Sequence, residues 1–140
     1  MKTSIIHPAT FMLDGGAMFG IIPRPLWSKK ITPDEQNRIH MSLRVMLIET
    51  ENKKILVDTG IGDYHPEKFC HQFNIKAQSS PLLSILKEQK NIEADQITDI
   101  IITHLHFDHV GGLGHQDDDG KMQPVFKNAT IHVHKDHYAY

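Results

Sequence analysis

Residues 100–112 read Ile-Ile-Ile-Thr-His-Leu-His-Phe-Asp-His-Val-Gly-Gly, and this stretch decides the fold of the chain. Three consecutive isoleucines are typical of a buried strand, so the polar residues after them are expected at its carboxyl end. His104 and His106 are two positions apart, and in an extended segment such residues face the same side, about 6.5 Å apart. Two imidazoles so placed can bind one ion, with Zn–N distances of about 2.0–2.1 Å.

Asp108 and His109 follow where the chain must turn to reach Gly111 and Gly112. A carboxylate and a third imidazole at such a turn can serve a second, adjacent ion. A lone histidine is more often a surface or core residue than a ligand. Four ligand-type residues at H-x-H-x-D-H spacing, between a strand and a glycine pair, indicate a metal site.

The motif resembles the signature of the metallo-β-lactamase superfamily, and its wording is especially similar to the N-acyl homoserine lactone lactonase branch. Residues 55–60, Ile-Leu-Val-Asp-Thr-Gly, are similar to an element found upstream of that motif, and residues 13–27 resemble the opening of bacterial members. The resemblance covers nearly the whole chain but only the first half of such an enzyme. It implies an α/β fold: the N-terminal half of an αββα sandwich, with a mixed sheet and helices on one face.

The resemblance also implies roles for these residues. His104 and His106 would bind the first of two zinc ions, and Asp108 and His109 the second; iron or manganese would also suit these ligands. Asp108 is a candidate catalytic residue through a hydrogen bond to the water that bridges the ions. Asp58 would support the ligands, since metal-bound imidazoles usually donate to a carboxylate. A cap on the Thr59-Gly60 turn is the equally open alternative for Asp58.

Such an ion pair lowers the pKa of water and polarises a carbonyl, so the expected reaction is hydrolysis of a small lactone or ester by a metal-bridging hydroxide. A glyoxalase-type thioesterase and a phosphoester hydrolase are the alternatives among hydrolases. The enzymes of the superfamily also use further His and Asp ligands downstream, and this chain ends at Tyr140 before them. We therefore expect completion by a C-terminal half or by oligomerisation. The alternative from another class is a non-catalytic metal-binding or association module.

Composition narrows the class of protein. The 140 residues suit a single domain over 1–140, with 39% hydrophobic and 23% charged residues. A net charge of −2 argues against a nucleic-acid partner. Eleven histidines fit a metal protein, and the single Cys70 cannot form an intrachain disulfide. No apolar run approaches a membrane span and no signal pattern opens the chain, so the expected location is the cytoplasm, away from the membrane.

The remaining pattern predicts the other elements. We expect one or two strands over 3–13, a hairpin over 41–58, strands at 99–103 and 129–134, and a helix from Pro81 to about Lys90 after a serine cap. Residues 92–97 are predicted to be a short connector with one helical turn. Residues 20–38, 61–80 and 115–121 are predicted to be irregular. 

Two groups of side chains carry weaker predictions. Met18, Phe19 and Trp27 could form an apolar wall of a substrate pocket, or Trp27 could simply pin its loop to the core. His132 and His134 form a second H-x-H, followed by Asp136 and His137. We expect its histidines to face outward, with Ile131 and Val133 in the core, and a metal role there is the less favoured alternative.

Overall fold

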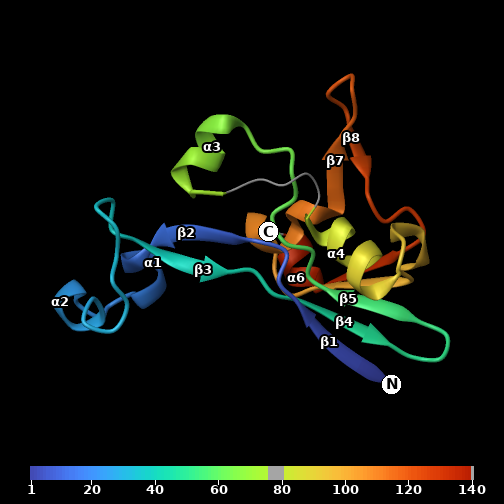
Figure 1. Cartoon of the computed structure of the whole chain (residues 1–140), viewed down its shortest axis with the longest axis horizontal. Coiled ribbons are helices and arrows are strands. Elements are labelled where there is room, and N and C mark those ends of the chain that lie inside the picture. The colour runs from blue at the N-terminus through green and yellow to red at the C-terminus, as the bar shows by residue number, and fades with distance from the viewer. Residues whose placement is uncertain (76–80, 140) are drawn as a thin grey trace.

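A mixed five-stranded sheet forms the centre of the computed structural model, which describes residues 1–75 and 81–139. Its strand order is β1-β4-β5-β6-β9, with bounds Lys2–Ile6, Val45–Glu49, Lys54–Val57, Asp99–Ile102 and Thr130–Val133 (Figure 1). The pairs β1–β4 and β4–β5 are antiparallel, whereas β5–β6 and β6–β9 are parallel. The predicted α/β class and mixed sheet are confirmed.

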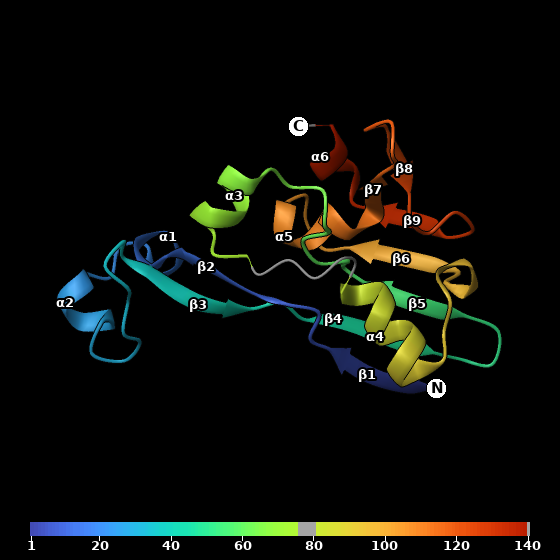
Figure 2. The ribbon, with the colours of Figure 1, turned by 45° about the horizontal axis from the view of Figure 1, so that its top comes forward.

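One helix covers one face of this sheet. Helix α4 (Pro81–Lys90) lies over the sheet in Figure 2. Its Leu82 and Leu86 belong to one core cluster with Leu47, Leu56 and Ile100, and these three strand residues are wholly buried. The helix ends at Asn91, whose φ of 55° turns the chain so that the Ile92 N–H reaches the Leu86 carbonyl at 2.9 Å. The predicted helix is therefore present, while its predicted serine cap lies outside the described residues.

The opposite face of the sheet is apolar and open. Ile5, Met46, Val57 and Ile101 stand in register across β1, β4, β5 and β6. Three of them are substantially exposed, at 48% for Ile5, 37% for Met46 and 41% for Ile101. A contiguous row of aliphatic side chains in water is typical of a surface that another element covers. We call this row the open face.

A second, smaller sheet pairs β2 (Thr10–Asp14) with β3 (Arg38–Ser42) and carries two short helices, α1 (Gly15–Phe19) and α2 (Arg24–Trp27). This lobe extends away from the main sheet in Figures 1 and 2. The predicted hairpin over 41–58 is confirmed for β4 and β5, but its first residues belong to β3. The prediction of an irregular segment 20–38 is wrong at α2, which begins after Pro23 with Pro25 in its first turn.

Three further expectations need correction. Helix α3 (Glu67–Gln72) interrupts the segment predicted to be irregular, because Phe69 and Phe73 pack on Phe107. Strands β7 (Gly114–Gln116) and β8 (Met122–Pro124) form a hairpin, where an unstructured loop was expected. Ile131 does not enter the core: its side chain is 51% exposed, because β9 lies at the edge of the sheet.

The other short elements are η1 (Ala94–Gln96), which is the predicted connector turn, α5 (Phe107–Val110), η2 (Gly111–Leu113) and α6 (Lys135–Tyr138). Within 1–75 and 81–139, none of the helices has the length and apolar character needed to cross a bilayer.

Candidate metal centre

The H-x-H-x-D-H stretch lies at the carboxyl end of β6, where the chain leaves the sheet and begins α5. Its backbone is tied to the segment after β5. The Thr59 N–H and hydroxyl donate to the His109 carbonyl at 2.8 and 3.0 Å, and the Gly112 N–H donates to the Gly60 carbonyl at 3.2 Å. Thr59 is 1% exposed, so these bonds are shielded from water. Residues 55–60 and residues 100–112, the two stretches that resemble the superfamily, are thus neighbours in space.

The glycine pair makes this contact possible. A Cβ at Gly111 would overlap the Ile61 carbonyl, and a Cβ at Gly112 would overlap the Thr59 carbonyl. Neither obstacle is a side chain that could rotate away; both are main chain. Glycine is therefore required at 111 and 112 by close backbone approach.

Asp58 contacts both the end of β6 and one of the candidate ligands. Its side chain is buried, and its carboxylate accepts hydrogen bonds from the Thr103 N–H at 2.9 Å and the Thr103 hydroxyl at 2.8 Å. The same carboxylate lies 2.8 Å from Nδ1 of His109. An acceptor at this distance assigns the proton to Nδ1 and leaves the Nε2 lone pair of His109 available to a metal ion. Asp58 itself has a φ of 61°, a conformation that aspartate and asparagine tolerate better than other side chains.

The imidazole rings of three candidate ligands, His104, His106 and His109, lie close together. The ring centroids of His104 and His106 are 4.5 Å apart, and those of His104 and His109 are 3.9 Å apart. Burial lowers the pKa of His104, and the neighbouring rings of His109 and His106 lower it further. The lowered pKa favours the neutral ring, which is the form that binds a metal.

The carboxylate of Asp108 faces the same group, with Oδ2 at 3.3 Å from Nε2 of His109. Three imidazoles and one carboxylate are the donor types that zinc prefers. Their atoms do not yet converge: across 1–75 and 81–139, no group of three or more His, Cys, Asp or Glu side chains is arranged to hold an ion as it stands. The chemistry of the donors fits zinc, and closing the site requires side-chain movement or further ligands.

The amino-acid sequence of the chain matches one protein-family model. Residues 44–139 match the family model of the metallo-beta-lactamase superfamily, which is more than half of the chain. The chain belongs to the metallo-beta-lactamase superfamily. Superfamily membership accounts for the position of the motif, at the carboxyl end of a strand in a mixed sheet.

Several relatives in the superfamily are similar to this chain. An N-acyl homoserine lactonase of Bacillus cereus is 28% identical over 131 residues, which is 84% of this chain and 46% of the lactonase. An N-acyl homoserine lactonase of Bacillus thuringiensis is 34% identical over 101 residues, covering 66% of this chain and 36% of that protein. The chain thus spans less than half the length of these curated relatives.

Solved structures give the same picture of the superfamily fold. A probable metal-dependent hydrolase from Staphylococcus aureus superposes with a TM-score of 0.86 and 32% identity, over 99% of this chain and 48% of that one. AidC, a dizinc quorum-quenching lactonase in complex with an N-acyl homoserine product, superposes with a TM-score of 0.69 and 28% identity, over 98% and 42% of the two chains. The chain therefore has the superfamily fold over somewhat less than half the length of these solved structures.

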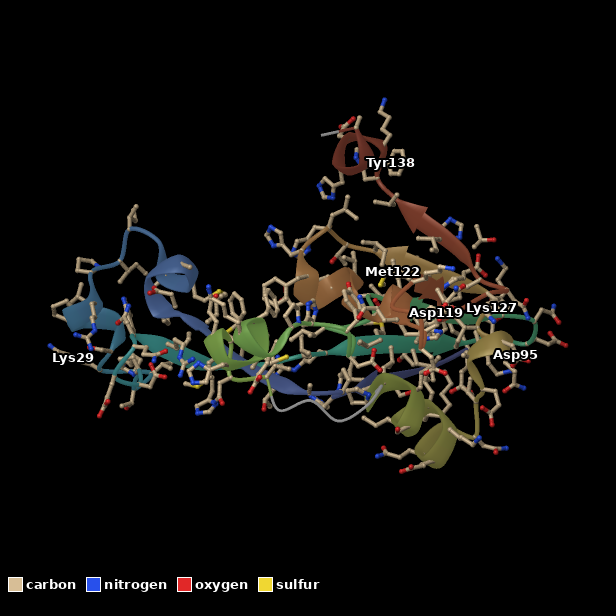
Figure 3. The ribbon with its side chains drawn as sticks, turned by 90° about the horizontal axis from the view of Figure 1, so that it is seen from above. Lys29, Asp95, Asp119, Met122, Lys127 and Tyr138 are labelled. Atoms are coloured by element: carbon tan, nitrogen blue, oxygen red, sulfur yellow. The ribbon has the colours of Figure 1, made fainter. Side chains whose placement is uncertain are left out.

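The residues proposed as a substrate wall lie elsewhere in the molecule. Trp27 is buried against Gly15 and stacks on Phe19, with ring centroids 5.0 Å apart. Lys29, two positions after Trp27, lies at one end of the molecule, far from Tyr138 of α6 (Figure 3). Trp27 thus packs within the α1–α2 lobe, and the structure does not bring it to the histidines. A substrate role for Met18, Phe19 and Trp27 stays a prediction.

Sequence reasoning missed two contributors to the region. Thr103 is the last residue of the predicted strand 99–103, and its hydroxyl donates to Asp58 and lies 3.1 Å from Nδ1 of His104. Phe107 lies between the candidate ligands, and its ring packs edge-on against Phe11 and Phe69. Within the motif, the apolar Leu105 and Phe107 alternate with the polar residues, and this alternation is the sequence signal that could have predicted the packing of Phe107.

Proposed function

We propose that this chain is the metal-binding half of a zinc-dependent hydrolase that acts on a lactone or ester. The observation that carries the proposal is the close packing of the His104, His106 and His109 rings at the end of β6, with His109 oriented by Asp58. Relatives named as N-acyl homoserine lactonases support the substrate class.

Each residue has a separate task in this proposal. His104 and His106 bind a first zinc ion, and Asp108 with His109 bind a second. Bound zinc supplies Lewis acidity and lowers the pKa of water, which makes hydrolysis possible at neutral pH. Asp108 also accepts a hydrogen bond from the attacking water and so orients it. Asp58 fixes the ring of His109 and, through Thr103, the end of the strand.

The open face supports a role for a second polypeptide segment. Catalytic zinc sites normally have three protein ligands per ion, whereas the motif offers two for each of two ions. An apolar sheet face also needs a partner to be excluded from water. We propose that a C-terminal half, of the kind the longer relatives possess, covers this face and contributes the remaining ligands.

Complementation tests the proposal directly. The zinc-loaded chain is assayed on N-hexanoyl homoserine lactone and on an aryl ester, alone and mixed with the separately prepared C-terminal half of the Staphylococcus aureus hydrolase. We expect hydrolysis in the mixture and its loss with His106→Ala, while His40→Ala, an exposed imidazole on β3, keeps activity. Equal turnover by the His106→Ala mixture would refute the site. A thioester and a phosphoester in the same panel distinguish the other hydrolase classes.

A non-catalytic association module is the second candidate, and the exposed row Ile5, Met46 and Ile101 favours it. In that case the mixture forms a stable complex and binds zinc but leaves every substrate of the panel intact. Sedimentation of the mixture, read together with the assay, separates this outcome from simple failure of the two halves to combine.

A further inference from the structure

Helix α3 connects the smaller sheet to the metal motif. Figure 2 shows this helix next to both β2 and α5. On the motif side, the ring centroids of Phe69 and Phe73 lie 5.1 and 4.8 Å from that of Phe107. On the side of the smaller sheet, the Met12 N–H donates to the Phe73 carbonyl at 2.6 Å. The helix therefore reaches the candidate metal centre through Phe107, which is the first residue of α5.

Arg38, the first residue of β3, holds the C-terminal end of this helix. Its Nη1 donates to the main-chain carbonyls of His71 and Gln72 at 3.2 and 2.7 Å. The last carbonyls of a helix have no partner within the helix, and an arginine nearby can supply one. The guanidinium group of Arg38 therefore provides hydrogen bonds that α3 cannot make for itself.

Asp34 fixes the orientation of this guanidinium group. Nε and Nη2 of Arg38 each lie 2.8 Å from Oδ2 of Asp34, and the Arg38 N–H donates to Oδ1 at 2.8 Å. The two side chains are only 18% and 27% exposed, so salt screens this pair less than it would a fully exposed one. A planar guanidinium can bind a carboxylate along one edge and carbonyls along another, which a lysine ammonium cannot do.

Phe107 links the position of α3 to the candidate ligands. It follows His106, the N-cap of α5, and precedes Asp108 in the same helix. Its ring also meets that of Phe11 on β2 edge-on, with centroids 6.0 Å apart. A helix of four residues depends on such packing for its position. A shift of the Phe107 ring would therefore move the backbone that presents both candidate ligands.

We propose that Arg38 is a positioning residue for the candidate metal centre. By holding the end of α3, it keeps the two aromatic rings of that helix against Phe107 and so fixes the backbone between His106 and Asp108. The proposal rests on the proposed metal-binding function of the motif. It gives a residue of the smaller sheet a part in zinc binding, through α3 rather than through contact with the ion.

Zinc affinity of the chain, measured by competition with a chromophoric chelator, tests the proposal. We expect Arg38→Ala to weaken binding by about 3- to 30-fold, the range for substitutions that act through a chain of packed side chains. Lys53→Ala is the matched control, since it removes the cation of another partly buried pair, 3.0 Å from Asp99 at the start of β6. It should leave zinc affinity unchanged. An equal loss in Lys53→Ala would mean that general destabilisation is the cause, and would overturn the proposal.

Arg38→Lys is a second variant that keeps the positive charge. A single ammonium cannot meet the Asp34 carboxylate and both helix carbonyls at once, so we expect a zinc affinity between those of the unaltered chain and Arg38→Ala. Circular dichroism in urea records whether each variant is folded. Unaltered zinc affinity in both Arg38 variants, or in Arg38→Lys where Arg38→Ala does not fold, overturns the proposal.

A double-mutant cycle tests the route through the aromatic rings. Phe69→Leu combined with Phe73→Leu removes both rings of α3 and keeps apolar side chains. In that background Arg38→Ala should weaken zinc binding no further, because its route to Phe107 is already lost. Losses that add in full would show that Arg38 acts in another way, and would overturn the proposal.

The same measurements separate this proposal from the proposed function. Zinc binding that is lost in His106→Ala but indifferent to both Arg38 variants refutes only the positioning role. If His106→Ala binds zinc as tightly as the unaltered chain, the proposed function fails together with it.

Discussion

Oδ2 of Asp58 lies 2.8 Å from Nδ1 of His109, although the two residues are 51 positions apart in the chain. The contact joins the turn after β5 to helix α5, and Thr103 reinforces it by donating to the same carboxylate. One buried side chain therefore holds both the end of β6 and the ring of a candidate ligand.

Asp58→Asn should lower zinc affinity while preserving the fold. Asparagine tolerates the φ of 61° at this position and keeps one acceptor oxygen, but it cannot bear the charge that holds His109. We expect a loss of about 10–100-fold in affinity, measured by chelator competition. Asp58→Ala should add a fall in the urea midpoint, because the Thr103 N–H then loses its acceptor. Unaltered zinc affinity in both variants would show that Asp58 does not contribute to zinc binding.

Gly111→Ala should destabilise the chain by about 3 kcal/mol, the upper end of the range for overpacked sites, because the new methyl group overlaps the Ile61 carbonyl. Urea denaturation followed by circular dichroism measures the change. Gly114→Ala is the matched control: its Cβ would overlap only the terminal methyl of Met122, which can rotate, and would lie in ordinary contact with the Gln123 carbonyl. A control as damaging as Gly111→Ala would show that the close backbone approach is not the cause.

Asp99 should make stability depend on pH in the acid range. Its pKa is lowered from 3.8 to about 2 by hydrogen bonds from His132, Thr98 and Lys53. A lowered folded-state pKa stabilises the fold above pH 3.8, and the contribution disappears as the pH falls from 3.8 through 2.

The urea midpoints of the unaltered chain and of Asp99→Asn, measured from pH 7 to pH 2, test this. We expect the unaltered chain to be more stable near neutral pH and the two midpoints to approach each other below pH 3.8. A difference that is constant over the whole range would mean that the charge of Asp99 contributes nothing.

Trp27→Ala should lower the free energy of unfolding by about 3–5 kcal/mol, because it empties the space against Gly15 and Phe19. Zinc affinity should not change, since α2, which carries Trp27, lies in the lobe away from α5 and the motif. Met18→Ala, at an exposed position, should change stability by less than about 0.5 kcal/mol. Substrate selectivity of the complemented enzyme, measured with Met18→Ala, then tests the predicted substrate wall separately from stability.

The main sheet was predictable because its strands carry unambiguous apolar patterns. Ile100–Ile102 and Leu56–Val57 form the predicted strands, and the helix at Pro81 begins where proline favours it. Helices α2 and α3 were not predicted, since helices of four and six residues depend on packing rather than on local signals. 

Which side chains of β9 are buried was harder to predict than the presence of the strand itself. Alternation along 130–133 says which residues share a face, but not how far the core extends at the edge of the sheet. Ile131 lies on the same side as the buried Ile100, yet it is 51% exposed among the residues that the structure describes. The positions of Thr103 and Asp58 likewise depend on a contact between distant segments, which local periodicity does not contain.

The contact of Gly111 and Gly112 with the main chain at Ile61 and Thr59 separates the scaffold of the metal motif from its chemistry. The loop is placed by close backbone packing, by bonds between peptide groups, and by the side chains of Thr59 and Asp58. An exchange of the motif side chains leaves these contacts in place. This chain offers a frame on which a designer could exchange ligands for another metal, provided that both glycines and Asp58 are kept.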